Sequence, residues 1–438
     1  MIYNQRAANC NRQLSMEPSS GKPLAGARAA LWLLLSINLF NYIDRQILAA
    51  VEPEIRATFF SPNDPNAMAR TGALGTAFLV TYMMSAPALG WLADRFPRWV
   101  IVGTCVILWS LASGASGLAT TFALLVFTRI CVGIGEGGYG PAAPTILADL
   151  YPLQSRGRVL AIFCAAIPVG SALGYVLGGL IKVNLDWRWA FYLVTPPGLL
   201  LGLLCFTRRD PRGDGATKKK QRRATWDDYV TLFRTPSYVF NTLAQTAMTF
   251  AIGGLGFWMP AYLQFRQQPP SALPIFGGII VVAGLISTLL GGFVADQLRA
   301  RYAGSYFLVS GFGMLAGFPL FIAMLFAPFP FAWVFLFASV FLGFLNTGPS
   351  NAALANVSLP AVRATAFALN ILIIHAFGDA AAFPAIGFVA GHTSMNTAFL
   401  LVSAMMFVAG LLWLLGAKFL PSDTTAVEAA TLQGQLSI

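Results

Sequence analysis

The sequence predicts an all-α membrane protein with twelve transmembrane helices, arranged as two six-helix repeats that run in parallel. Two observations carry this fold class: 57% of the 438 residues are hydrophobic while only 10% are charged, and a short motif of the first half returns in the second. A soluble domain carries about 25% charged residues. This chain has too few polar side chains to cover a water-exposed surface, so lipid must cover much of it.

Apolar runs long enough to span a bilayer, about 20 residues each, follow one another along nearly the whole chain. Each is predicted to be helical, because an isolated strand would leave backbone groups without hydrogen-bond partners in lipid. The expected spans are 28–51, 70–93, 99–118, 122–148, 158–181, 187–206, 238–264, 273–296, 305–327, 330–356, 362–390 and 395–418. The domains expected from them are an N-terminal segment 1–27, a first bundle 28–206, a basic linker 207–236, a second bundle 237–420 and a tail 421–438.

The two bundles carry the same landmarks. Residues 90–94 (GWLAD) close the second span and residues 292–296 (GFVAD) close the eighth, while the Gly-Pro pair at 140–141 returns at 348–349. Two units of one orientation form a parallel repeat, whose substrate site is expected between the units near the middle of the membrane.

Lysine and arginine set the expected orientation. Most of the 28 basic residues fall in segments that lie on the same side as the N-terminus, which predicts cytoplasmic N- and C-termini. The run 218–223 (KKKQRR) is the strongest of these, and the apolar spacing after it, from Trp226, predicts a short interfacial helix. The run is either a lipid-headgroup contact or a solvated linker that fixes the topology.

Several function classes find no support in the sequence. The net charge of +11 is spread over short loops and forms no single basic face, so nucleic acid is not an expected partner. Two histidines and five scattered cysteines give no metal-ligand spacing and no disulfide framework. No nucleophile stands beside a base and no phosphate-binding loop is present, so we expect neither an enzyme nor a cofactor.

The loop after the second span predicts a gate. Gly90 lets helices approach closely, and Asp94 with Arg95 and Arg98 can form a charged latch at a helix end. The second copy keeps an aspartate, Asp296, but has no arginine beside it. A turn that only sets topology is the alternative reading.

Four segments resemble known families. Residues 90–98 (GWLADRFPR) resemble the inside-loop signature of the major facilitator superfamily, and the segments 41–45 (NYIDR), 129–136 (RICVGIGE) and 375–379 (HAFGD) resemble the Spinster family of lipid transporters. The resemblance implies the major facilitator fold. It also implies movement of amphipathic lipids, such as lysophospholipids or phosphorylated sphingoid bases, in many members coupled to protons.

Six ionisable side chains lie inside the predicted spans, namely Asp44, Arg45, Arg129, Glu136, His375 and Asp379. A charge at the middle of a bilayer costs at least about 2.5 kcal/mol and usually marks a substrate path or a proton relay. A structural ion pair that fixes helix register is the alternative. For His375 a packing role is also open, and for Asp379 both readings remain.

Depth along the spans suggests partners. At about 1.5 Å per residue from the outer helix ends, Asp44, Arg45 and Arg129 share one level and Glu136 lies deeper, which pairs Asp44 with Arg129. Glu136 then has no arginine at its level and is the expected proton-coupling carboxyl, with Asp44 tuning it. Arg129 and Arg45 are the expected receivers of an anionic headgroup.

We therefore expect a secondary transporter that works by alternating access. Its substrate site is assigned to Arg129, Arg45, Asn41, His375 and Asp379. The expected partners are an amphipathic lipid or organic anion, protons and bilayer lipids, and the expected state is a monomer in a bacterial inner membrane. A proton-coupled carrier of small organic anions and a passive lipid scramblase remain as alternatives.

Overall fold

The computed structural model describes residues 23–210, 226–359 and 362–436, and in these ranges the chain is helical with no strand. The basic run 218–223 lies outside them. The first bundle contains α2 (Ala27–Ala50), α3 (Glu52–Phe59), α4 (Ala67–Arg95), α5 (Arg98–Gly117), α6 (Phe122–Gly137), α7 (Tyr139–Leu150), α8 (Leu153–Asn184) and α9 (Arg188–Cys205). The second contains α11 (Pro236–Phe265), α12 (Ala272–Arg299), α13 (Ser305–Phe326), α14 (Phe331–Phe344), α15 (Thr347–Asn356), α16 (Arg363–Ile374), η2 (His375–Asp379), α17 (Ala380–His392) and α18 (Met395–Gly416).

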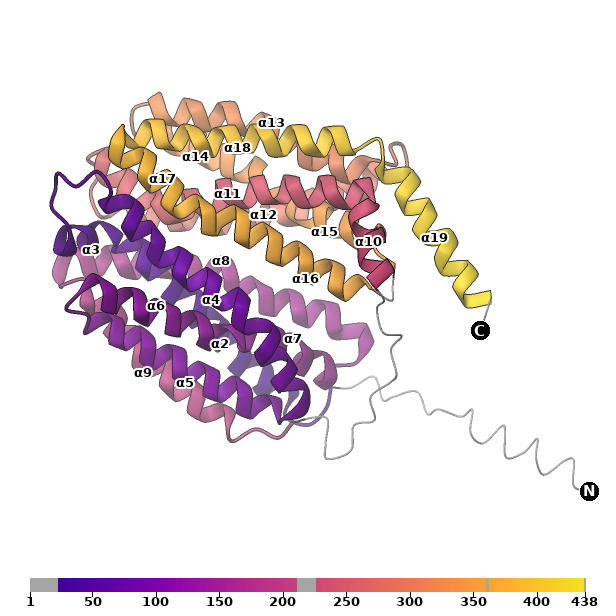
Figure 1. The fold of residues 1–438 in the computed structure, drawn as a ribbon, viewed down its shortest axis with the longest axis horizontal. Coiled ribbons are helices and arrows are strands. Elements are labelled where there is room, and N and C mark those ends of the chain that lie inside the picture. The colour runs from indigo at the N-terminus through magenta and orange to yellow at the C-terminus, as the bar shows by residue number, and fades with distance from the viewer. Residues whose placement is uncertain (1–22, 211–225, 360–361, 437–438) are drawn as a thin grey trace, which may run out of the picture.

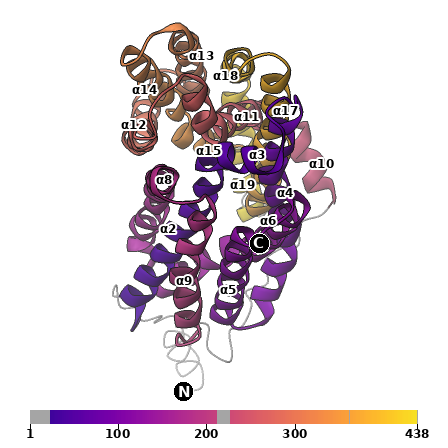
Figure 2. The same cartoon turned by 90° about the vertical axis from the view of Figure 1, so that its left-hand side faces the viewer.

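Helices cover every predicted span. Ten of the described helical segments are long and apolar enough to cross a membrane. The other two predicted spans, the first and the seventh, are occupied by α2 and α11, which carry more polar side chains. The all-α fold class is confirmed, and the two bundles lie side by side in both views (Figures 1 and 2).

Three predicted spans are broken, and in the eleventh the break is η2, between α16 and α17. The fourth divides into α6 and α7 at Gly138, and the tenth divides into α14 and α15 before Thr347. Both breaks lie close to the repeated Gly-Pro pair, at 140–141 and 348–349. Glycine weakens a helix and proline removes a backbone donor, so the repeat seen in the sequence appears as two matching breaks.

The molecule has two distinct ends. We call the end that carries α3 the α3 end, and the end that carries α10 (Trp226–Arg234) and α19 (Leu420–Leu436) the linker end (Figure 1). The helix expected from Trp226 is α10, whereas α3 and α19 were not expected. Asp423 of α19 accepts a hydrogen bond from the backbone of Ser237, which attaches α19 to the start of α11.

The bundles meet closely near the α3 end. A Cβ atom at Gly72 of α4 would lie 2.5 Å from the carbonyl oxygen of Phe383 in α17, and one at Gly387 of α17 would lie 2.5 Å from that of Met68. Glycine is therefore required for this contact of backbone against backbone, which we call the glycine seam. Small residues allow such close helix packing in membranes.

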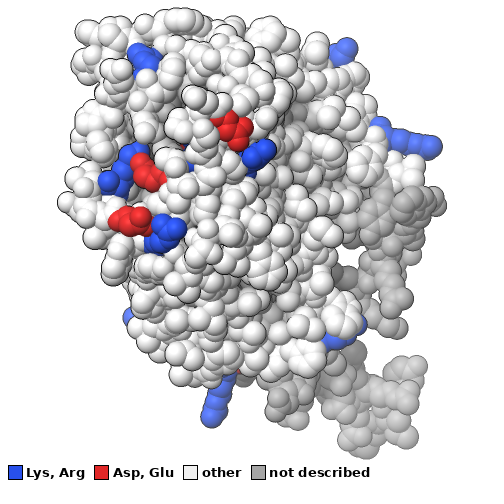
Figure 3. Space-filling view, turned by 60° about the vertical axis from the view of Figure 1, so that its left-hand side comes forward, with Lys and Arg blue, Asp and Glu red and all other residues white. Residues whose placement is uncertain are grey.

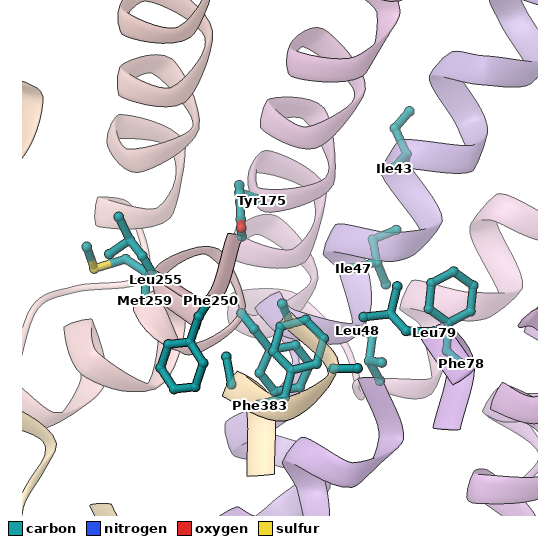
Figure 4. Packing of buried hydrophobic residues seen from close by; sticks show 14 of the residues in the cluster. Ile43, Ile47, Leu48, Phe78, Leu79, Tyr175, Phe250, Leu255, Met259 and Phe383 are labelled. Atoms are coloured by element: carbon teal, nitrogen blue, oxygen red, sulfur yellow. The ribbon is translucent and has the colours of Figure 1, made fainter. Parts of the chain in front are cut away.

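In the described part of the chain, two hydrogen bonds link the bundles. Thr76 of α4 donates to the Ala380 carbonyl at 2.6 Å, and Tyr175 of α8 donates to the Gly256 carbonyl at 2.7 Å. Aromatic packing fills the space between them, because Phe383 stacks on Phe257 with ring centroids 4.6 Å apart. Figure 4 shows Phe383, Leu48, Leu79 and Tyr175 gathered at this junction of the two bundles.

The outer surface fits a lipid environment. Figure 3 shows charged side chains gathered toward one end of the molecule, with a broad uncharged surface beside them. At the α3 end the described ion pairs include Asp64 with Arg70 and Lys182 with Glu54. An uncharged belt between polar ends is what a protein that spans a bilayer presents to the acyl chains.

Candidate substrate site between the two bundles

A cavity of about 850 Å³ lies between the bundles. All six ionisable residues expected inside the membrane line this single cavity, namely Asp44, Arg45, Arg129, Glu136, His375 and Asp379. Helices α2, α4, α6 and α8 form one wall, and α11, α12, α14 and α17 contribute to the other. The cavity stops at the junction formed by Tyr175, Phe257 and Phe383, so it is closed toward the α3 end.

Arg45 and Glu136 form a buried ion pair. The Arg45 Nε and Nη2 atoms each lie 2.7 Å from Glu136 Oε2. The Glu136 side chain is fully buried, while that of Arg45 is 21% exposed to the cavity. The expectation that no arginine reaches the level of Glu136 is therefore wrong.

The reason is the position of the α2 terminus. Helix α2 ends beneath α3, and Ala49, Ala50 and Val51 are fully buried there. When residue 51 is taken as the membrane surface, the predicted depth of Arg45 in the membrane is too small. The long guanidinium side chain then spans the remaining distance to α6.

Asp44 and Arg129, which were expected to pair, form no direct ion pair, and each binds a serine of α5 instead. The Ser113 hydroxyl of α5 donates a hydrogen bond to Asp44 Oδ1. Arg129 Nη2 donates to the Ser116 hydroxyl at 2.6 Å, one turn further along α5. Helix α5 therefore places hydroxyl groups beside both buried charges.

Several polar atoms in this cluster have no hydrogen-bond partner in the described structure. They are Asp44 Oδ2, Glu136 Oε1, Arg129 Nε and Asn41 Nδ2. Leaving a buried charged group short of partners is costly, so the cluster has free capacity for a ligand or a proton.

Three aromatic rings surround the Arg45 guanidinium. Its centre lies 5.1 Å from the ring centroid of Tyr42, 5.0 Å from Phe78 and 5.1 Å from Tyr82. Cation–π contact is worth about 0.5–2 kcal/mol per ring. The rings therefore stabilise the Arg45 cation in addition to its ion pair with Glu136.

The opposite wall of the cavity is mostly apolar. Its lining includes Ile252, Ile280, Leu285, Leu289 and Phe344. The polar exception is η2, a π-type segment with non-helical backbone angles at Gly378, in which His375 Nδ1 lies 3.1 Å from Asp379 Oδ2. π-Helical turns often occur at functional sites. One wall of the cavity is therefore charged and the other is mostly apolar.

Comparison with known proteins places the chain in a family. Residues 34–382 match the Major Facilitator Superfamily. The sphingosine-1-phosphate transporter SPNS2 of Xenopus tropicalis is 34% identical over 416 residues, which cover 88% of this chain and 79% of that protein. Human protein spinster homolog 1 is 34% identical over 401 residues, covering 85% and 75%. The chain belongs to the Spinster family of the Major Facilitator Superfamily.

Solved structures agree with this Spinster fold. A bacterial homolog of the human lysosomal transporter Spinster, in an inward-facing and unoccupied conformation, aligns with a TM-score of 0.77 at 21% identity, over 93% of this chain and 99% of that one. A D-xylose–proton symporter aligns with a TM-score of 0.71 at 20% identity, over 88% and 96%. Membership of this family makes the chain a multi-pass membrane transporter and not an enzyme.

The expected gate residues of this Spinster protein lie at the linker end, and the contacts described for Arg95, Arg98 and Asp296 stay on their own half of the molecule. Arg98 Nη2 lies 2.6 Å from Asp149 and 3.0 Å from Asp210. Arg95 lies over the Trp91 ring at 3.5 Å, and Asp296 accepts from the Tyr306 hydroxyl at 2.9 Å. The side chain of Asp94 lies outside the described residues. None of these described contacts joins one bundle to the other.

Gly90 and its counterpart also pack within their bundles. A Cβ atom at Gly90 would lie 3.6 Å from Pro141 of α7, an ordinary contact. In the second bundle a Cβ atom at Gly348 of α15 would lie 3.3 Å from Gly292 of α12. Equivalent helices are therefore in contact in the two bundles, α4 with α7 in the first and α12 with α15 in the second.

Sequence reasoning missed three groups of site residues. The aromatic rings around Arg45 were not predicted, because aromatic residues are common in membrane helices. Tyr42 does lie within the segment 41–45, which resembles the Spinster family. Ser113 and Ser116 of α5 were not predicted as site residues, because they carry no charge. Arg158 also lines the cavity, but it was counted among the loop charges that set topology.

Proposed function

We propose that this protein is a proton-coupled secondary transporter of a single-chain anionic lipid, such as a phosphorylated sphingoid base or a lysophospholipid. One observation carries the proposal: a cavity between the bundles holds the Arg45–Glu136 pair on one wall and an apolar surface on the other. An amphipathic anion matches both walls at once. Its headgroup faces the arginines and its chain lies along α12 and α14.

Headgroup binding and proton uptake are linked through Arg45. A phosphate or carboxylate that accepts hydrogen bonds from the guanidinium draws it away from Glu136 Oε2. The carboxylate then stays buried without its counter-ion, and a proton on Glu136 restores neutrality. One negative charge and one proton thus enter the site together, which leaves its net charge unchanged.

The linkage works in both directions. If the anion favours proton uptake at Glu136, a proton on Glu136 must favour anion binding by the same factor. The free Oε1 atom of Glu136 is available to carry that proton. Arg129, whose Nε has no partner, offers a second donor to the headgroup, and Asp44 beside Ser113 adjusts the local charge.

Alternating access is supported by the closed α3 end. The glycine seam and the Tyr175–Gly256 hydrogen bond close the cavity on that side, whereas the gate residues at the linker end bind within their own bundles. A passive scramblase would need a continuous path across the membrane. The closed end favours a carrier that opens to one side at a time.

Names of related proteins add support. SPNS2 of Xenopus tropicalis is named as a sphingosine-1-phosphate transporter, and one of the matching structures is named as a proton symporter. We transfer to this chain the class of substrate, a phosphorylated single-chain lipid, and the use of protons. We also propose that the linker end faces the cytoplasm of a bacterial inner membrane. Alkaline phosphatase fused after residue 438 should then be inactive.

The test is transport into proteoliposomes. Purified protein is given sphingosine-1-phosphate, oleoyl lysophosphatidate or a small dicarboxylate, with and without an imposed pH gradient. We expect saturable uptake of the two lipids that rises with the gradient and falls when a protonophore collapses it. Uptake of the dicarboxylate alone would move the assignment to small organic anions. Lipid movement that neither saturates nor responds to the gradient would indicate a scramblase.

A further inference from the structure

Arg158 is a cation of the cavity that the site described above does not use. It lies in the second turn of α8, lines the cavity and is exposed. The described residues include no hydrogen-bond or ion-pair partner for it. This separates Arg158 from the other arginines at this end, such as Arg98, which is held by Asp149 and Asp210.

Each carboxylate of the cavity lining already has a partner other than Arg158. Glu136 is paired with Arg45, Asp44 accepts a hydrogen bond from Ser113, and Asp379 contacts His375. Arg158 is therefore a cation of the lining that no described carboxylate holds. An exposed, unpaired cation in a cavity raises the local concentration of anions around it.

Arg158 lies at the mouth of the cavity. Helices α8 and α12 touch near the α3 end, where a Cβ atom at Gly277 would lie 3.0 Å from the carbonyl oxygen of Ala172. Both helices extend from this contact toward the linker end, α8 as far as Arg158 and beyond, and α12 past Leu289. Leu289 also lines the cavity, yet it is 76% exposed. The two helices have therefore separated at the level of Arg158, and the gap between them opens the cavity.

The mouth is far from the buried charges. Gly170 of α8 packs against Leu39 and Tyr42 of α2, which sets the level of Tyr42 along α8. Arg158 lies twelve residues before Gly170, which corresponds to about 18 Å of helix. A headgroup cannot touch Arg158 and Arg45 at the same time, so it must pass from one to the other.

We propose that Arg158 is a capture site for the anionic headgroup, separate from the inner site. The headgroup pairs first with Arg158 at the mouth and then moves inward to Arg45 and Arg129, while the chain of the lipid follows the apolar wall of α12. This inference rests on the proposed function, because it requires an anionic amphiphile as substrate.

A capture site predicts a specific change in the kinetics of binding. Because the headgroup no longer touches Arg158 once it is bound inside, loss of Arg158 should leave the equilibrium Kd unchanged. The rate constants of association and dissociation should then fall by the same factor. An exposed ion pair is worth up to about 1 kcal/mol, so the expected factor is about three to five at low salt. It should disappear at high salt, where exposed charges are screened.

The experiment uses the full-length protein in nanodiscs of phosphatidylcholine, with oleoyl lysophosphatidate carrying a fluorophore at the end of its chain. Stopped-flow mixing measures association and dissociation for the wild type, Arg158→Gln, Arg158→Lys and the control Arg301→Gln. Arg301 is an exposed cation at the same end that does not line the cavity and lies over the Tyr302 ring. Arg158→Lys and Arg301→Gln should behave as the wild type.

The outcomes separate this inference from the proposed function. Absence of saturable binding to the wild-type protein would overturn the proposed function itself. Normal wild-type binding with unchanged rates in Arg158→Gln at low salt would overturn the capture site alone. A raised Kd in Arg158→Gln would place Arg158 in the inner site and would also overturn it. Arg158→Glu serves as a second variant, with a larger slowing expected from the reversed charge.

Discussion

The two bundles bury polar side chains in different ways. In the first bundle the buried polar cluster consists of ions, and Asp44, Arg129 and Glu136 each keep an atom without a hydrogen-bond partner. In the second bundle the buried cluster consists of amides and hydroxyls. Asn241 donates to the Ser350 carbonyl at 3.1 Å and accepts from Trp413 at 2.9 Å, so both ends of its amide are used.

Gln245 completes the network of the second bundle. Its Nε2 donates to the Ser350 hydroxyl at 3.0 Å, and its Oε1 accepts from Asn370 at 2.7 Å. These bonds join α11, α15 and α16 through neutral groups that do not titrate. Hydrogen bonds of this kind fix a geometry without responding to pH or to an anion.

The difference assigns separate tasks to the two bundles. Groups that can gain a proton or exchange a partner are concentrated in α2, α5 and α6, with the His375–Asp379 pair as the exception in the second bundle. Helices α11, α15 and α16 are held by a neutral network. We infer that the first bundle senses substrate and proton and that the second moves against it as a rigid body. The predictions below test this division, beginning with the largest expected effect.

Glu136→Gln should abolish accumulation driven by a pH gradient while substrate exchange persists. The amide has nearly the shape of the protonated carboxyl but cannot release a proton, so binding survives and coupling is lost. Gradient-driven uptake and counterflow are measured in the same proteoliposomes. Asp186→Asn, in an exposed loop at the α3 end, is the control and should keep both. Full gradient-driven uptake by Glu136→Gln would move the proton site to Asp44 or Asp379.

Arg129→Ala should weaken binding of an anionic lipid by about 2 kcal/mol, or roughly thirtyfold, because a charged hydrogen bond is lost. Binding of monoolein, which shares the oleoyl chain but has no charge, should change far less. Isothermal titration with oleoyl lysophosphatidate and monoolein gives both values. Equal losses for the two lipids would make Arg129 a structural residue.

Gln245→Leu should destabilise the second bundle by about 1–3 kcal/mol, since Asn370 and Ser350 lose buried partners. The pH profile of transport should stay the same, because no titrating group is touched. Ser113→Ala is the matched variant in the first bundle: it removes the hydroxyl from Asp44 and should move the pH profile. Thermal unfolding and transport between pH 5 and 8 are measured for both. A shifted profile in Gln245→Leu would contradict the division of tasks.

Asp94→Asn should have the smallest effect. If Asp94 belongs to a latch that closes the linker end, its loss favours the open state and increases labelling of Cys164, an exposed cysteine that lines the cavity. A surface ion pair is worth about 0.2–1 kcal/mol, so the increase should be at most about fivefold. A variant that keeps only Cys164 is used for labelling. An unchanged labelling rate would remove Asp94 from the gate.

Much of this architecture follows from the sequence. The apolar runs determine the helices because lipid tolerates no unpaired backbone. The gathering of Asp44, Glu136 and Asp379 in one cavity also follows, because charges in membrane helices turn away from the acyl chains. The matching breaks in the fourth and tenth spans follow from glycine and proline at equivalent positions.

The pairing of charges could not be predicted in the same way. Depth counted along a helix assumes that every helix starts at one plane, and α2 ends below α3. That difference brings Arg45 to Glu136 instead of leaving Glu136 without a partner. Arg158 shows a related limit, because a basic residue near a helix end looks the same in the sequence whether it faces water or a cavity.

The glycine seam has a consequence for how such a carrier can evolve. Its contact of backbone on backbone, Gly72 on Phe383 and Gly387 on Met68, does not depend on the side chains that line the cavity. Substitutions at Ile280, Leu285 or Phe344 can then alter the preferred chain length of the cargo while the closure at the α3 end stays as it is. Selection can act on cargo and closure as separate traits within one fold.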